Sequence, residues 1–174
     1  MGPAGTTAIR RVSQAAGEDM FSRVLVGYDG SPGARRALEL GTELARAAPD
    51  ADLLVVAVEG HLPHYGATVG EFDEERELEE RECRRWLEEA TAYTQARGVA
   101  ARAEVVSGHP AQQLLHAAHR AHADLVVLGH SGHSAVWGRF LGTTVEKVSR
   151  HATCSVLIAA PSAGRGAAGD DSWV

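Results

Sequence analysis

Cysteine and long apolar runs are scarce in this sequence, and each scarcity removes a class of protein. Only two cysteines occur among 174 residues, Cys83 and Cys154, and they lie far apart without metal-ligand spacing. A disulfide framework and a cysteine metal site are therefore not expected. No apolar stretch approaches the roughly 20 residues that a membrane-spanning helix needs. We expect a cytoplasmic globular protein of about one domain, with no membrane partner.

Basic charge is also scarce. The net charge is −6, and the arginines at positions 81, 84 and 85 are surrounded by acids, so we expect no nucleic-acid partner. The single lysine, Lys147, does not follow a glycine, which excludes a Walker A motif. No G-x-G-x-x-G follows the first apolar run either. Phosphates bound here would be held mainly by backbone amides and hydroxyls, with help from Arg139 or a histidine.

The two ends of the chain differ in composition from its middle. Residues 1–20 are rich in small and polar residues and show no apolar periodicity, and residues 162–174 are small and polar with one tryptophan. Such segments bury too little apolar surface to become ordered. We expect a disordered extension at 1–20, a folded domain at 21–161 and a disordered tail at 162–174.

Between those ends, apolar runs alternate with segments of helical spacing. Five short runs predict buried strands, at Arg23–Tyr28, Asp52–Val58, Ala101–Ser107, Asp124–Gly129 and Cys154–Ala160. Four helices are predicted between them, from Pro32 with Ser31 as N-cap, from Glu71 to Arg97, from Pro110 and from Thr143. This alternation predicts an α/β fold, a five-stranded parallel sheet with helices on both faces.

Glycines gather in the segment that leaves the fourth predicted strand. Gly129, Gly132 and Gly142 are followed by Thr143, where the last helix begins. Glycine lets peptide N–H groups approach an anion, and a helix N-terminus adds free donors and a favourable dipole. In parallel sheets, ligands bind beyond the carboxyl ends of the strands, where this segment lies. The pattern favours a phosphate site, the alternative being glycines needed only for turns.

Asp29 follows the first predicted strand at the same edge of the sheet. Its carboxylate could accept hydrogen bonds from a ribose hydroxyl or an adenine amino group. It could equally cap the turn and helix that follow. The residue types alone leave both roles open.

These stretches together resemble a known family, the nucleotide-binding universal stress proteins, over about residues 22–160. The resemblance rests on four stretches, RVLVGYDGSPGARRALELG, DLLVVAV, HADLVVLG and GHSGHSAVWGRFLGTTVEKVSRHATCSVLIAA. The last stretch is similar to the family's G-x2-G-x9-G-[ST] signature for ATP. The resemblance implies a Rossmann-like fold of the adenine nucleotide alpha hydrolase type that binds ATP, with Mg²⁺ or Mn²⁺, and pairs into homodimers, which we expect to form through the last strand.

The resemblance also implies roles for particular residues. Asp29 and Val58 would contact the adenosine, and five residues would surround the ribose and phosphates, namely Gly129, Gly132, Gly142, Thr143 and Thr144. The chain departs from the family pattern where His130 precedes Ser131 between the first two glycines, and where Ser155 replaces a frequent proline. The first departure bears on phosphate geometry, and the second on the entry to the last strand.

Nine histidines raise the question of a metal site. His116, His119 and His122 recur at steps of three on the third predicted helix, but His122 is expected on its apolar face, more than 100° around the helix from His116. We therefore expect no metal-binding residues there. His61 and His64 could line the mouth of a nucleotide site, and His130 and His133 could touch phosphates.

Three functions fit these patterns. The favoured one is an ATP-binding regulatory module of a stress response, with slow or no hydrolysis and no catalytic residues. The second is an adenylate-hydrolysing enzyme, for which Asp29 and Glu59 are candidates only if both reach the phosphates. The third is a stress-associated dimer that no longer binds nucleotide.

Overall fold

The computed structural model describes residues 21–48, 50–60, 69–130 and 142–160, and within 69–76 it describes the backbone alone. Several predictions of the sequence concern other residues. The ends expected to be disordered, together with Gly132, Arg139 and the histidines at positions 61, 64 and 133, lie outside the described residues.

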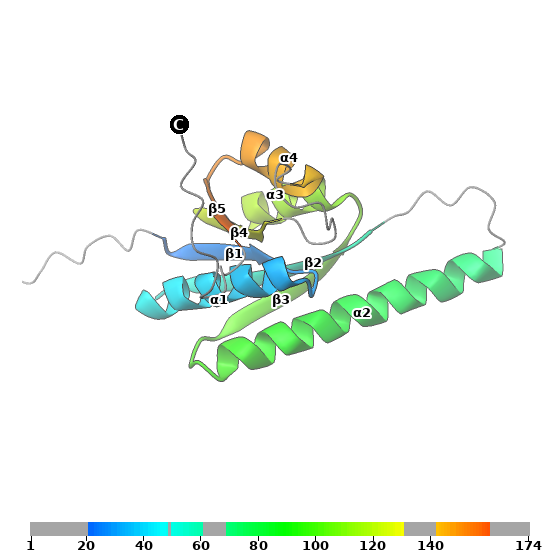
Figure 1. Cartoon of the computed structure of the whole chain (residues 1–174), viewed down its shortest axis with the longest axis horizontal. Coiled ribbons are helices and arrows are strands. Elements are labelled where there is room, and N and C mark those ends of the chain that lie inside the picture. Colours follow the sequence, from blue (N-terminus) through cyan, green and yellow to red (C-terminus); the bar gives the residue numbers. More distant parts are fainter. Residues whose placement is uncertain (1–20, 49, 61–68, 131–141, 161–174) are drawn as a thin grey trace, which may run out of the picture.

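Strands and helices alternate along the described chain as the sequence predicts (Figure 1). The strands are β1 (Arg23–Gly27), β2 (Asp52–Glu59), β3 (Ala101–Ser107), β4 (Leu125–Gly129) and β5 (Ser155–Ala159). The helices are α1 (Pro32–Ala47), α2 (Val69–Gln95), α3 (Pro110–Arg120) and α4 (Thr143–His151).

The strands form one parallel sheet in the order β3-β2-β1-β4-β5. Along the chain, β2 and β3 are added on one side of β1, and β4 and β5 are then added on its other side. The strand order therefore reverses between β1 and β4. In Figure 1, α1 and α2 cover one face of the sheet, and α3 and α4 cover the other. The expected α/β fold is confirmed.

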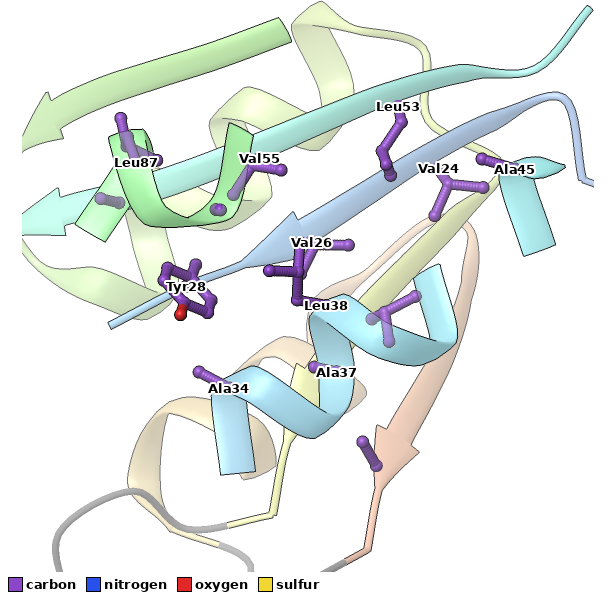
Figure 2. Close-up of a cluster of buried hydrophobic side chains, with 14 of the residues drawn as sticks. Val24, Val26, Tyr28, Ala34, Ala37, Leu38, Ala45, Leu53, Val55 and Leu87 are labelled. Carbon is purple, nitrogen blue, oxygen red and sulfur yellow. The ribbon is translucent and has the colours of Figure 1, made fainter. Parts of the chain in front are cut away.

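The apolar strands fill a separate core on each face of the sheet. Val24 and Val26 of β1 pack with α1 and α2, as Figure 2 shows, whereas Leu25 packs with α3 and α4. Successive side chains of a strand point to opposite faces, so a strand covered on both sides must be apolar throughout. Burying each such side chain contributes about 1.5–3 kcal/mol relative to exposing it.

The start of α1 follows the local signal in the sequence. Ser31 has extended backbone angles, and its hydroxyl oxygen accepts a hydrogen bond from the Ala34 amide at 3.1 Å. Pro32 occupies the first helical position, where its missing N–H costs nothing. The predicted N-cap is confirmed, and it fixes where the chain turns after β1.

The placement of His122 on an apolar helix face is wrong. Helix α3 ends at Arg120, and His122 lies beyond it, exposed, with a φ of 49°. The His122 amide donates to the His119 carbonyl at 3.1 Å and the Ala123 amide donates to the Ala118 carbonyl at 2.8 Å. These two bonds close the helix in a Schellman motif, which needs one left-handed residue. The helical periodicity therefore stops before His122.

Candidate functional site

The candidate site lies where the strand order reverses, at the carboxyl ends of β1 and β4. Val26 of β1 pairs in register with Val127 of β4, so the segments that follow these strands leave the sheet side by side. One segment carries Asp29 and the other begins at Gly129. The structure therefore brings these two predicted residues to one edge of the sheet, as parallel topology requires.

Val58 belongs to the same edge. It is the penultimate residue of β2, it is half-buried, and it packs against the α3 and α4 core. Gly27 at the end of β1 is in register with Val56, so Val58 extends past β1 on the sheet's carboxyl side. An apolar side chain there can offer a contact to a planar ring.

The Asp29 carboxylate has a local role. Asp29 is exposed, and its Oδ1 atom accepts a hydrogen bond from the Ser31 amide at 3.0 Å. Aspartate often closes a turn in this way. The capping role that the sequence left open is therefore present, and it fixes the direction of a carboxylate at the reversal of strand order.

Gly129 is glycine because the backbone of α1 passes directly over it. A Cβ atom on Gly129 would lie 2.5 Å from the Ala34 nitrogen and equally close to the Gly33 carbonyl oxygen. Conversely, a Cβ atom on Gly33 would lie 2.8 Å from the His130 carbonyl oxygen. The sequence pattern suggested that an anion approaches these glycines, but at Gly129 the approaching backbone belongs to the protein.

Gly142 has a different reason to be glycine. It is the N-cap of α4, its φ is 76°, and as a glycine it has no side chain of its own to cap the helix. A left-handed φ disfavours residues with a Cβ atom. Thr143 is exposed at the first helical position, and Thr144 is half-buried behind it. The amide groups of the first turn have no acceptor within the helix, so this turn can donate to an anion.

Glu59 does not join Asp29 as a second acid at the site. It is 7% exposed at the end of β2 and accepts a hydrogen bond from the Ser107 hydroxyl at 2.8 Å. Its side chain lies on the α2 face, because side chains alternate along a strand and Ala57, two residues earlier on β2, packs in the core beneath α1 and α2. Burial, followed by the nearby Glu59 carboxylate, raises the pKa of the Cys83 thiol on α2 to about 11. Helix α4 covers the opposite face of the sheet. The structure therefore does not support the condition set for a hydrolysing enzyme, that Asp29 and Glu59 both reach the phosphates.

Sequence reasoning missed the contacts that α2 makes with the loop after β1. Trp86 lies against Gly30, and Glu89 accepts hydrogen bonds from Tyr28 and Arg35. It also missed Lys147, whose Nζ lies 3.5 Å from the Nε2 atom of His109 at the start of α3. No local signal reveals such pairs, because the partners are distant in sequence.

Metal-binding clusters and membrane spans are absent from the described residues. Among them, no group of three histidine, cysteine, aspartate or glutamate side chains is arranged to hold a metal ion. Within the same part of the chain, no helix has the length and apolar character needed to cross a membrane. Cys83 and Cys154 are both free thiols.

Comparison with known proteins shows which family this chain is similar to. The sequence model of the universal stress protein family matches residues 20–160. The chain belongs to the universal stress protein family. A universal stress protein of Thermus aquaticus is 40% identical over 144 residues, which cover 80% of this chain and 98% of the relative. The sequence resemblance is thus confirmed.

Solved universal stress proteins share the fold. The structure of one from Lactobacillus plantarum superposes with a TM-score of 0.71 at 22% identity, covering 79% of this chain and 97% of that one. Another, described as a universal stress protein in complex with cAMP, has a TM-score of 0.62 at 26% identity, covering 82% and 99%. The parallel sheet with helices on both faces is therefore the architecture of this family.

Proposed function

We propose that this universal stress protein binds ATP at the reversal of strand order between β1 and β4 and acts as a regulatory module. The observation that carries the proposal is the convergence, at one sheet edge, of a fixed carboxylate on Asp29 and the start of α4 at Gly142 and Thr143. These groups suit the two ends of a nucleotide, one rich in donors and the other anionic. Stress response and a cytoplasmic location are parts of the same proposal.

In this proposal, each group of residues contacts a particular part of the nucleotide. Asp29 and Val58 would meet the adenosine, and the first turn of α4, with Thr143 and Thr144, would meet the phosphates. Gly129 would lie between them beneath the ribose. A divalent ion, Mg²⁺ or Mn²⁺, would neutralise phosphate charge when bound, with phosphate oxygens, water and a threonine hydroxyl as the available hard ligands. Gly132 belongs to the proposed phosphate contacts but lies outside the described residues.

A related structure supports a nucleotide as the class of ligand. The universal stress protein solved in complex with cAMP is 26% identical to this chain and aligns with 82% of it. Its ligand shares the adenosine and one phosphate with ATP, while a triphosphate has more charge for the helix start to receive. The choice of ATP within this class is part of the proposal.

Slow or absent hydrolysis follows from the placement of the acids. Hydrolysis needs a group that orients water at the terminal phosphate, and usually carboxylates that hold a metal there. Asp29 already accepts from the Ser31 amide, and Glu59 lies on the face of the sheet opposite α4. Glu59 is therefore not placed as a base beside the first turn of α4, and the proposal assigns the Asp29 carboxylate to the adenosine end of the nucleotide.

We also propose that the protein forms a homodimer through β5. This strand is one edge of the described sheet, and its central residues, Val156, Leu157 and Ile158, are half-exposed and apolar. An edge strand leaves backbone groups unpaired, and a two-fold copy of the same strand can cover them. Light scattering at micromolar concentration should report a dimer, and a purely monomeric species would overturn this part of the proposal.

The first experiment identifies the nucleotide. Protein purified without added nucleotide is denatured, and the released small molecules are analysed by liquid chromatography and mass spectrometry. ATP or ADP at a substantial fraction of the protein concentration is expected, and the stripped protein should bind ATP in calorimetry. A protein with no copurified nucleotide and no heat of ATP binding would be the nucleotide-free dimer instead.

The second experiment separates a binding module from an enzyme. Asp29→Ala is expected to weaken ATP binding by about 5- to 150-fold, the effect of losing a charge-assisted hydrogen bond. Any hydrolysis at saturating ATP should stay nearly unchanged, because removing a hydrogen bond that is equally strong in the ground and transition states raises KM and spares kcat. Asp29→Asn is the matched control, since its amide oxygen can still accept from Ser31. Retained affinity with a collapsed kcat would favour the enzyme.

A further inference from the structure

The loop that carries Asp29 is supported from one side by α2. Gly30, the next residue, has a φ of 70°, and a Cβ atom there would lie 2.5 Å from Nε1 and 2.7 Å from Cδ1 of Trp86. The indole edge of Trp86 therefore lies directly against the loop backbone. Gly30 must be glycine on both counts, because its φ is left-handed and Trp86 occupies the space of a side chain.

The residue before Asp29 is held by the same helix. Tyr28 is 3% exposed, and its hydroxyl donates to Oε1 of Glu89 on α2 at 3.2 Å. Nε of Arg35, in the first turns of α1, donates to the same oxygen at 3.0 Å. Figure 2 shows Tyr28 at the end of β1, between α1 and the part of α2 that carries Leu87. Glu89 thus joins β1, α1 and α2.

The electrostatic surroundings of these groups agree with the geometry. Burial, followed by the nearby Glu89 carboxylate, raises the pKa of Tyr28. The hydrogen bond from Arg35 lowers the pKa of Glu89. At neutral pH, Tyr28 is therefore a hydroxyl donor and Glu89 a charged acceptor, which is the pairing that the distances require.

Global stability alone does not explain the contacts that Trp86 and Glu89 make with the loop after β1. The side chains of Arg35 and Glu89 are 55% and 46% exposed, and ion pairs this exposed add little to folding. What the contacts do is fix both neighbours of Asp29, Tyr28 through Glu89 and Gly30 through Trp86. The Ser31 amide then fixes the carboxylate itself. A ligand-binding group held in this way loses little freedom when it binds.

We propose that Trp86 and Glu89 are positioning residues for nucleotide binding, acting through the Asp29 loop without touching the ligand. The inference rests on the proposed function. It makes α2 part of the binding apparatus, so that nucleotide affinity depends on how α2 lies against the loop. By linkage, nucleotide binding stabilises the contacts of α2 with Tyr28 and Gly30.

The test is a double-mutant cycle on ATP affinity in the full chain. Trp86→Ala and Glu89→Ala are each expected to weaken ATP binding by about 3- to 10-fold. This range is the net strength of one hydrogen bond, here the bond from the nucleotide to the Asp29 carboxylate that the two residues position. Combined with Asp29→Ala, either change should cause almost no further loss, because the group that it positions is gone. Glu80→Gln, which breaks the exposed Arg84–Glu80 pair elsewhere on α2, is the matched control and should bind as wild type.

Two conservative variants keep the test decisive where an alanine variant folds poorly. Glu89→Gln retains an acceptor for Tyr28, and Trp86→Phe retains a flat ring, so each should recover part of the lost affinity. Wild-type affinity in all Trp86 and Glu89 variants would overturn the inference while leaving the proposed function intact, provided Asp29→Ala still weakens binding. Losses that add in full to that of Asp29→Ala would also overturn it. If wild type binds no ATP, the proposed function itself fails.

Discussion

Two glycines of one sequence signature, at the two ends of the candidate site, are glycines for different reasons. Gly129 closes β4, and the space for its side chain is filled by the backbone of Gly33 and Ala34. Gly142 opens α4 with a φ of 76° and, as a glycine, supplies no side-chain cap of its own. The first is demanded by packing within the protein, and the second by the conformation of a helix start that can receive an anion.

In the proposed site, one sequence signature combines requirements of the fold with requirements of the ligand. Close packing of α1 on β4 places the Asp29 loop and the β4 end next to each other, so Gly129 contributes to the site by allowing it to form. Gly142 contributes by exposing the donors of α4. Substitutions at the two positions should therefore separate stability from binding.

The largest expected effect is on stability at Gly129. In Gly129→Ala the new methyl group would overlap the α1 backbone, which cannot move without displacing the helix from the sheet. We expect a loss of at least about 3 kcal/mol in the free energy of unfolding, or no folded protein. Urea unfolding followed by circular dichroism measures it. A Gly129→Ala protein within about 1 kcal/mol of wild type would show that the two backbones are not in contact.

The next effect concerns binding at Gly142, and the chain provides a matched control. Gly98, just after α2, also has a φ of 76°, and a Cβ atom there would meet nothing within 4 Å. Gly142→Ala and Gly98→Ala should each cost about 1–2 kcal/mol of stability, the strain of a left-handed residue. Only Gly142→Ala should also weaken ATP binding, by about 10-fold or more. Equal ATP affinity in both variants would remove Gly142 from the site.

A smaller effect is expected at Thr143, the exposed first residue of α4. Thr143→Val removes the hydroxyl but keeps the shape, and it should weaken ATP binding by about 2- to 10-fold, the net strength of one hydrogen bond. Thr143→Ser keeps the hydroxyl and should bind as wild type. Calorimetric titration of the three proteins decides, and an unaltered Thr143→Val would confine the phosphate contacts to backbone amides.

The smallest expected effect is on the free energy of unfolding at low pH, through the contact between Glu89 and Arg35. The Glu89 pKa is lowered in the folded state by the hydrogen bond from Arg35. A group with a lowered folded pKa stabilises the fold above its unfolded pKa, and the contribution is lost as pH falls through the folded value. Wild type should therefore be slightly more stable than Glu89→Gln at pH 7, and the difference should shrink as the pH is lowered through the folded pKa of Glu89. A difference that grows in acid would have the wrong sign.

Much of the fold followed from local patterns. Ser31 before Pro32 predicted the start of α1, and the apolar run at Asp124–Gly129 predicted a strand covered on both faces, which the structure has as Leu125–Gly129. Parallel strands joined by helices then predicted that any ligand site would lie at their carboxyl ends. These features could be predicted because each depends on neighbours in the sequence or on a rule of chain connection.

The rest depended on residues that meet only in the folded chain. The sequence shows that position 129 is glycine, but the reason lies in Gly33, on a different element. In the sequence, Trp86 belongs to the apolar stripe of a strongly charged helix and Glu89 is one of its many charges, and nothing on α2 marks the loop that they support. The error at His122 was local, because a left-handed residue other than glycine can end a helix without interrupting its apolar spacing.

The central claim, that ATP binds at the reversal of strand order, is tested most directly by mapping the site in solution. Amide resonances of the 18.4 kDa chain are recorded while ATP and Mg²⁺ are added to stripped protein. The largest shifts are expected at Asp29–Ser31, at Gly129 and at Gly142–Thr144. Amides at the amino ends of the strands, such as that of Ser22, which donates to the Asp124 carboxylate, should stay unchanged. Shifts confined to the amino ends of the strands, or no shifts at saturating ATP, would contradict the account.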